Sequence, residues 1–184
     1  MGGRGARSWS SLMKDVPGVC VEDAMANTNP NFEKGEEWRT NCQRCVYAYE
    51  MNRRGVVCEA KPSILDEIDY CALSWENVMK NQTWEKLGAK RRKSAIQNIE
   101  NKMEEFGDGS RGIIYLKWKD GRSHVFNVEN TEGQIKYIEA QSGKEIRIKS
   151  YMRLANPTTI KLSRVDNLEP NWYIMNQAIE RKSK

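Results

Sequence analysis

The chain of 184 residues contains a single histidine, and no segment approaches the about 18 consecutive apolar residues of a membrane-spanning helix. Its first residues, MGGRGARSWSSLMKDVPG, are basic but lack the apolar core of a secretory signal peptide. We therefore expect neither a membrane span nor a signal peptide. The cysteines number five, which argues against a complete disulfide framework and favours reduced thiols at a cytoplasmic site of action.

Positive charge is in modest excess, with a formal net charge of +5 that lies largely in the segments KLGAKRRK and ERKSK. The run from Lys90 to Lys93 is typical of a solvated helix face or turn, and no aromatic side chains interleave with it to stack on bases. Nucleic-acid binding is therefore disfavoured, and steep salt dependence of binding would be its signature.

Composition divides the chain into two parts. Residues 1–37 are rich in Gly, Ser, Asn and Pro, and we expect a flexible lead-in or linker with one helical turn at about residues 21–25. Residues 38–184 are expected to form one domain. Apolar periodicity and capping signals predict helices at about residues 39–55, 63–84, 89–106 and 171–182.

The middle of the second part changes to a period of two. The segment RGIIYLKWKDGRSHVFNVENTEGQIKYIEAQSG contains three alternating runs separated by the turn signals KDGR and NTEG, which predicts an antiparallel meander. VVCEAKP is a further short extended piece, and TIKLSRVDNLEP offers another strand. Helices followed by an antiparallel sheet indicate the α+β class.

The single histidine, His124, lies in the second strand of this predicted meander. If the NTEG turn is centred on its TE pair, His124 faces Glu139, and if it is centred on its EG pair, His124 faces Gln141. Both registers place Glu139 and Gln141 on the same side of the sheet as His124. A carboxylate or amide could then bind the imidazole and fix its tautomer.

Two cysteines three residues apart, Cys42 and Cys45, begin the first predicted helix. A thiol attacks as thiolate, and a helix N-terminus together with an adjacent imidazolium lowers the pKa of a thiol. The imidazole can take the thiol proton and later protonate the leaving group. A cysteine at a helix start, followed by a histidine and a polar residue on strands, is the arrangement of papain-like hydrolases.

Two other uses of a C-x-x-C motif fit the sequence less well. A structural zinc site needs four ligands, whereas Cys58 and Cys71 fall in different elements and His124 is a lone donor. A thioredoxin-like redox site needs a preceding βαβ-type strand, which the sequence does not predict. We therefore expect no metal and no cofactor.

Four segments in this order, NCQRCVYAYEMNRRGVVCEAKP, GDGSRGIIYLKW, GRSHVFNVENTEGQIKYIEAQSGKE and SRVDN, resemble the papain-fold toxin domains of the glutamine-deamidase type. Those domains occur at the C-termini of bacterial polymorphic toxins and of phage head-morphogenesis (MuF-type) proteins. The resemblance covers roughly residues 38–170. It implies a papain-like fold, in which N-terminal helices with the nucleophile helix precede a twisted antiparallel sheet.

The resemblance also implies a Cys–His–Asp triad. Its cysteine falls in NCQRC, and its histidine maps to His124. The family aspartate opens a D-x-Q-[ST]-G motif, for which this chain has EAQSG, so Glu139 stands in the aspartate position. Glutamate is one methylene longer than aspartate, and Gln141 and Asp166 are further candidates for the orienting role.

The motif leaves two candidates for the nucleophile. Cys42 follows Asn41 at the first helical turn, where unpaired backbone N–H groups and the helix dipole favour a thiolate. Cys45 lies one turn deeper beside Val46, as expected of a packing residue, although an alignment on the papain-type C-x-x-C-W-A pattern favours it. We expect Cys42 to attack, with Cys45 as the alternative, and Asn41 or Gln43 to supply an oxyanion donor.

The activity that the resemblance implies is protein-glutamine deamidation through a thioester, on a protein substrate that bears a reactive glutamine. The same triad acting on a peptide bond would make a cysteine protease, and a weak or inactive triad would leave a papain-fold binding or structural module of a phage or toxin protein. A cognate immunity protein and delivery as part of a secreted toxin or phage particle are implied as well. Core positions, rather than a cleft, are expected for Trp75, Trp84, Trp118 and Trp172.

Overall fold

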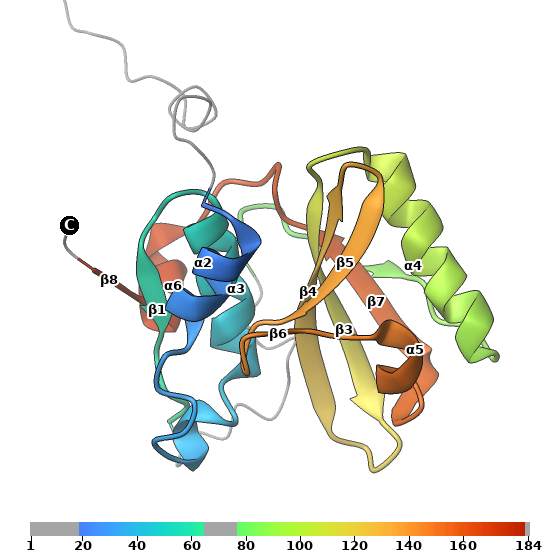
Figure 1. Cartoon of the computed structure of the whole chain (residues 1–184), viewed down its shortest axis with the longest axis horizontal. Coiled ribbons are helices and arrows are strands. Elements are labelled where there is room, and N and C mark those ends of the chain that lie inside the picture. Colours follow the sequence, from blue (N-terminus) through green and yellow to red (C-terminus); the bar gives the residue numbers. More distant parts are fainter. Residues whose placement is uncertain (1–18, 65–76, 183–184) are drawn as a thin grey trace, which may run out of the picture.

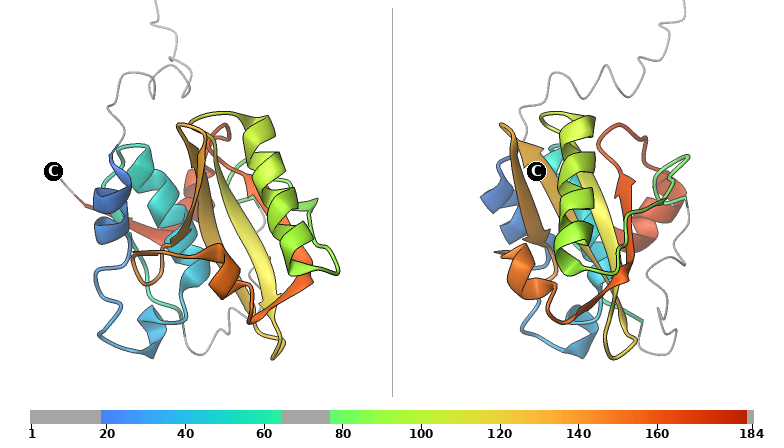
Figure 2. Two further views of the ribbon diagram at one scale, coloured as in Figure 1. Left: turned by 45° about the vertical axis from the view of Figure 1, so that its right-hand side comes forward. Right: turned by 90° about the vertical axis from the view of Figure 1, so that its right-hand side faces the viewer.

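A six-stranded antiparallel sheet lies between two groups of helices in the computed structural model, which describes residues 19–64 and 77–182 (Figure 1). Helix α3 packs directly on one face of the sheet, with α2 and α6 beside it, and α4 and α5 cover the other face (Figure 2). The predicted α+β class is confirmed. The helices are α2 (Val21–Thr28), α3 (Cys42–Arg53), α4 (Arg92–Phe106), α5 (Ile148–Tyr151) and α6 (Trp172–Ala178).

The predicted meander forms the centre of the sheet. Strands β3 (Arg111–Trp118), β4 (Ser123–Thr131) and β5 (Gln134–Glu139) are neighbours, with β7 (Ala155–Arg164) on the far side of β3. The short strands β2 (Glu85–Lys86) and β6 (Lys144–Glu145) are the two edges of the sheet. A separate two-stranded sheet pairs β1 (Cys58–Ala60) with β8 (Ile179–Arg181).

The turn between β4 and β5 selects one of the two predicted registers. Glu132 and Gly133 both have left-handed backbone conformations, with φ of 53° and 75°, as a two-residue type I′ hairpin turn requires. Thr131 therefore pairs with Gln134, and the turn is centred on the EG pair. The register in which His124 and Glu139 are directly opposite one another is wrong.

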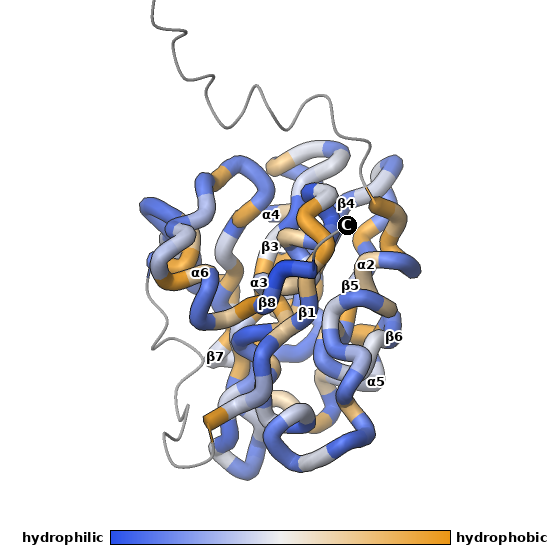
Figure 3. Tube along the Cα trace, turned by 90° about the vertical axis from the view of Figure 1, so that its left-hand side faces the viewer, coloured by the Kyte–Doolittle hydropathy of each residue, from blue (hydrophilic) through white to orange (hydrophobic). Residues whose placement is uncertain are grey.

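Each face of the sheet has its own hydrophobic core. Alternate residues of β3 enter the two cores: Ile113 and Tyr115 belong to the α3 side, and Ile114 and Leu116 to the α4 side. Figure 3 views the α2 and α6 side, where hydrophobic stretches of these helices lie next to hydrophilic connecting segments. No helix within residues 19–64 and 77–182 is long and apolar enough to cross a membrane.

Helix α2 is longer than the single turn expected in the lead-in segment. Val21, Ala24 and Thr28 are buried, and the helix packs against α3 and β1. The Asn29 side chain then donates a hydrogen bond to the carbonyl of Gln141, 2.8 Å away. Packing against the core thus begins before the expected boundary at residue 38, while residues 1–18 of the expected lead-in lie outside the described residues.

Two helix predictions are wrong in part. Residues 65–76 of the helix predicted over 63–84 lie outside the described residues. Residues 77–84 are not helical but form turns, an isolated bridge and irregular chain, with Asn77 and Asn81 in left-handed conformations that interrupt a helix. The C-terminal helix ends at Ala178 rather than at residue 182, since Ile179 becomes the buried strand partner of Ala60. The helices predicted over 39–55 and 89–106 are confirmed as α3 and α4.

Candidate active site

Cys42 is the first residue of α3 and lies, partly exposed, in an open cleft of about 1010 Å³. The first backbone N–H groups of a helix have no partner within the helix and carry partial positive charge. A thiol at this place therefore meets donors and a favourable dipole. The cleft is lined on the helix side by Phe32, Arg39, Thr40 and Gln43. On the sheet side its lining comprises Tyr115, Lys117, Trp118, Asp120, Gly121, Arg122, Ser123, His124, Glu139, Gln141, Ser142 and Tyr151.

Cys45 lies one turn further along α3 and has no exposed surface. Its Sγ donates a hydrogen bond to Oδ1 of Asn41 at 3.2 Å. Burial, with a smaller contribution from the nearby Cys42 charge, raises the pKa of the Cys45 thiol well above its ordinary value. At neutral pH this thiol is therefore protonated and enclosed in the core.

His124 points from β4 toward the cleft and binds Glu139 through its ring. The β4–β5 ladder ends at the pair of Asn127 and Ile138, and Glu139 is the last residue of β5. In the observed register Gln141 would face His124 if β5 continued, but the chain turns away first. Glu139 therefore reaches His124 diagonally, with 2.7 Å between Nε2 of the histidine and Oε2 of the glutamate.

Three groups hold the Glu139 carboxylate. Besides His124, the hydroxyl of Tyr151 donates to Oε2, and the backbone N–H of Gln141 donates to Oε1 at 3.4 Å. Burial alone would raise the pKa of Glu139, but the hydrogen bond and charge of His124, helped by Tyr151, hold it below its usual range. Glu139 is therefore a carboxylate at neutral pH, able to accept from the imidazole.

Aromatic rings fix the plane of the imidazole. The ring of Trp118 stacks on His124, with centroids 5.4 Å apart and an interplanar angle of 25°. Tyr151 contacts Trp118 edge-on at 5.0 Å and Phe126 edge-on at 5.3 Å. Trp118 packs against the core, as predicted for the tryptophans. It also lines the cleft, whereas a core position rather than a cleft position was expected.

The charges around His124 favour its protonated form. Burial lowers the pKa of the imidazole, but the charge and hydrogen bond of Cys42, together with those of Glu139, outweigh burial and raise the pKa to about 10. Cys42 is therefore the thiol that the histidine faces. An imidazolium that faces a thiol can stabilise the thiolate as that thiol attacks, and it can donate a proton to the leaving group.

A cluster of amide side chains lies behind the cysteines. Asn41 accepts from Gln141 Nε2 at 3.4 Å through Oδ1, the atom that also binds Cys45. Its own amide hydrogens are directed at the Lys61 carbonyl, 3.1 Å away, and at Asn29 Oδ1, 3.4 Å away. The cluster ties the start of α3 to the loop after β5. Asn41 thus directs its donors away from the cleft, whereas Gln43, also buried, lines it.

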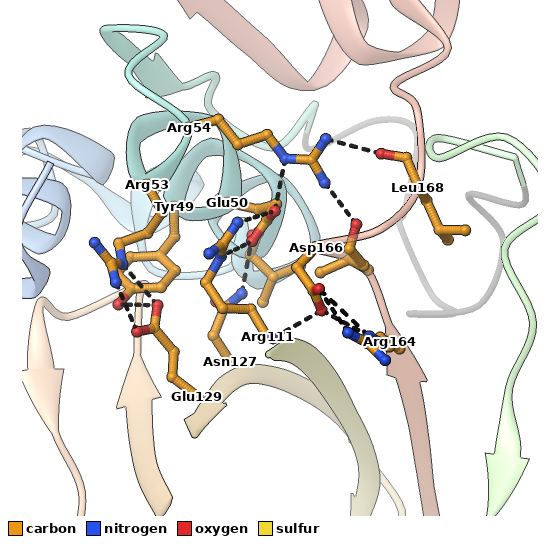
Figure 4. Close-up of polar contacts among 12 residues, drawn as sticks. Tyr49, Glu50, Arg53, Arg54, Arg111, Asn127, Glu129, Arg164, Asp166 and Leu168 are labelled. Atoms are coloured by element: carbon orange, nitrogen blue, oxygen red, sulfur yellow. Dashed lines mark hydrogen bonds and ion pairs between the residues drawn. The ribbon is translucent and has the colours of Figure 1, made fainter. Parts of the chain in front are cut away.

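Asp166 lies away from His124, in a group of ion pairs between the other end of α3 and the sheet (Figure 4). Its carboxylate accepts from the Arg111 backbone N–H at 2.9 Å and forms an ion pair with Arg164 at 3.0 Å. The expectation that Asp166 shares the orienting role is therefore wrong. An aspartate could either orient a histidine or pair with an arginine, and only the position of Asp166 in the fold shows that it does the second.

The same ion-pair group anchors α3 to the sheet. Glu50, which has no exposed side-chain surface, binds Arg54 of its own helix at 2.7 Å and Arg111 of β3 at 2.8 Å. Glu129 of β4 binds Arg53 at 2.8 Å and accepts from the Tyr49 hydroxyl at 2.9 Å. Charged contacts from the helix to two strands fix the orientation of α3 (Figure 4), and hence of Cys42 relative to His124.

Tyr151 and Asn29 contribute to the site but were not predicted from the sequence. Tyr151 follows Glu139 by twelve residues and sits on a helix of four residues, for which no periodic signal exists. Asn29 falls in the segment that its composition marked as a lead-in. Among the residues that the structure describes, no group of three or more His, Cys, Asp and Glu side chains could hold a metal ion.

A cysteine at the start of a helix, facing a histidine on an antiparallel sheet across a cleft, defines the papain-like class of proteins. Residues 40–144 match the family model of papain fold toxin 1, glutamine deamidase. Because this match spans more than half of the chain, the protein belongs to that family, and the predicted resemblance and papain-like fold are confirmed. Membership implies a cysteine-dependent hydrolase. Searches of curated proteins and of solved structures found no match.

Proposed function

We propose that the protein is a protein-glutamine deamidase in which Cys42 is the nucleophile, His124 the acid and base, and Glu139 the residue that orients His124. The observation that carries this proposal is the contact of His124 with Glu139 at 2.7 Å beside the partly exposed Cys42. Family membership supports the glutamine carboxamide as the group attacked. The buried and protonated state of Cys45 argues against the alternative nucleophile.

In the first half of the reaction the Cys42 thiolate attacks the side-chain carbonyl carbon of a glutamine and forms a C–S bond. The backbone N–H groups of the first turn of α3 are suited to stabilise the resulting oxyanion, and Gln43 is the candidate side-chain donor. The imidazolium of His124 then gives its proton to the amide nitrogen. The C–N bond breaks, ammonia leaves, and a thioester remains on Cys42.

In the second half His124, now neutral, takes a proton from a water molecule as that water attacks the thioester carbon. The C–S bond breaks, the substrate protein leaves with a glutamate in place of its glutamine, and the thiolate–imidazolium pair is restored. Glu139 stays a carboxylate throughout. Because it binds Nε2, the other ring nitrogen is left to exchange protons with Cys42, ammonia and water.

Two further hypotheses share this site. A peptide carbonyl in the cleft would undergo the same attack and make the protein a cysteine protease, and loss of reactivity would leave a binding or structural module of a phage or toxin protein. For the deamidase we propose a reducing, cytoplasmic site of action after delivery in a secreted toxin or phage particle. A cognate immunity protein would act by covering the cleft.

The experiment that tests the proposed function compares bacterial lysate proteins treated with the wild type and with the Cys42→Ala variant. We expect ammonia release and conversion of glutamine to glutamate at a restricted set of sites, both only with the wild type, as mapped by peptide mass spectrometry. New peptide termini that depend on Cys42 would instead establish the protease. If neither deamidation nor new peptide termini appear, that result would contradict an enzymatic role on these proteins and favour the binding module.

A further inference from the structure

Tyr151 lies at the end of the short helix α5, beyond the part of the chain that matches the family model. Its hydroxyl donates to Glu139 Oε2, the same oxygen that binds His124. We propose that Tyr151 is a positioning residue, which fixes the longer glutamate so that its carboxylate can serve where the family has aspartate. This inference rests on the proposed function, since it names the residue that holds Glu139 in place to orient His124.

A glutamate in this position has a problem that an aspartate lacks. Its side chain has one more rotatable bond, so its carboxylate can reach several places, and ordering it costs conformational entropy. An imidazole that is bound only part of the time would turn away from the thiol. The carboxylate therefore needs further donors that hold it in one place.

The structure supplies those donors on both carboxylate oxygens. Oε2 accepts from His124 and from Tyr151, while Oε1 accepts from the backbone N–H of Gln141. The Gln141 contact, at 3.4 Å, is long and comes from the loop after β5. Tyr151 is thus the only side chain besides His124 that hydrogen-bonds Glu139 among residues 19–64 and 77–182.

The hydroxyl of Tyr151 is itself held in place. Its ring contacts Trp118 and Phe126 edge-on, and the neighbouring side chains Ile148 and Met152 are buried in the core under α4. Trp118 also stacks on His124, so one aromatic group positions both partners of the Glu139 carboxylate. Burial, followed by the charge of Glu139, raises the pKa of Tyr151, so its hydroxyl keeps its proton and remains a donor.

The test uses the fact that His124 is the only histidine of the chain, so that its imidazole signals are unambiguous in a nuclear magnetic resonance spectrum. Tyr151→Phe removes the hydroxyl and keeps the ring. We expect the Nε2 proton of His124, which is bonded to Glu139, to exchange with water at least about 10-fold faster in this variant. Deamidation should fall by about 10-fold in kcat/KM, largely through kcat, and alkylation of Cys42 should slow in parallel.

Tyr137→Phe is the matched control. Tyr137 is also buried and lies on β5 two residues before Glu139, but its hydroxyl has no hydrogen-bond partner among the described residues. Its removal should leave the His124 signal and the activity unchanged. In a Glu139→Gln background, Tyr151→Phe should have little further effect, because both substitutions disrupt the same contact.

An unchanged His124 signal and a kcat/KM within about twofold of wild type in Tyr151→Phe would overturn the positioning role. Effects of Tyr151→Phe and Glu139→Gln that multiply would overturn it as well, because the two residues would then act separately. The exchange and alkylation measurements need no substrate. A Tyr151-dependent His124 signal in a protein that deamidates nothing would therefore reject the proposed function and support the positioning role.

Discussion

Replacing Cys42 by alanine is expected to abolish deamidation, with kcat lower by at least about 10⁴-fold. Cys45, the other cysteine of the motif, cannot take over the attack, because it lies in the core and its Sγ is bound to Asn41. Burial keeps the Cys45 pKa well above its ordinary value, so the thiolate needed for attack does not form there at neutral pH. The measurement is the rate of ammonia release at saturating substrate, together with a thermal unfolding curve that should match the wild type.

Cys45→Ala is the control that separates the two cysteines. It removes a buried thiol and one hydrogen bond to Asn41, which keeps its contacts to Gln141 and Asn29. We expect a loss of about 1 kcal/mol in the free energy of unfolding and a kcat within about threefold of wild type. Loss of activity in a stably folded Cys45→Ala variant, with activity kept in Cys42→Ala, would reverse the assignment of the nucleophile.

Replacing Glu50 by glutamine is expected to destabilise the fold by about 3 kcal/mol or more, which is a large part of the stability of a single domain. The Glu50 carboxylate is fully buried between Arg54 and Arg111, at 2.7 Å and 2.8 Å. A neutral amide leaves both guanidinium groups without their countercharge in the protein interior. Urea unfolding at neutral pH measures the change, and α3 should loosen from the sheet first.

The pH dependence of this effect has a definite sign. Burial raises the pKa of Glu50, but the charges and hydrogen bonds of Arg111 and Arg54 outweigh it and hold the pKa below its ordinary value. A carboxyl with a depressed pKa stabilises the folded state above its unfolded pKa, and that contribution is lost as pH falls through the folded pKa. The difference between wild type and Glu50→Gln should therefore shrink in acid.

Glu169→Gln is the matched control for Glu50→Gln. Glu169 pairs with Lys80 at 3.2 Å, but both side chains are more than half exposed. Exposed pairs of this kind contribute less than about 1 kcal/mol. A Glu50→Gln variant that unfolds at the same urea concentration as Glu169→Gln would contradict the view that buried ion pairs anchor α3.

The fold could be predicted where local signals decide it. The start of α3, its C-terminal glycine and the alternating runs of the meander are properties of short segments, and the structure has all three. The choice of register was also available, since an EG pair suits a type I′ turn better than a TE pair. Helix α2 was predicted as a single turn only, because its full length depends on burial contacts that its composition does not reveal.

Only the part of the site that depends on strand alternation could be predicted from the sequence. Alternation places His124, Glu139 and Gln141 on one side of the sheet, but the end of β5 decides which of them meet. Tyr151 arrives from a helix whose position depends on the packing of Ile148 and Met152. The different burial of Cys42 and Cys45 likewise follows from how α3 lies on the sheet. The position of Cys42 in the first helical turn already indicated it as the nucleophile.

Alkylation by limiting iodoacetamide at about pH 6, mapped by peptide mass, tests the central claim most directly, because ordinary thiols are protonated there. Cys20 is an exposed free cysteine at the N-cap of α2, so it reports labelling by exposure and a helix N-terminus without the imidazole that faces Cys42. We predict that Cys42 reacts well before Cys20 in the wild type and loses this advantage in His124→Ala. Preferential labelling of Cys20, or a Cys42 rate unchanged in His124→Ala, would contradict a histidine-activated thiolate and with it the enzymatic account.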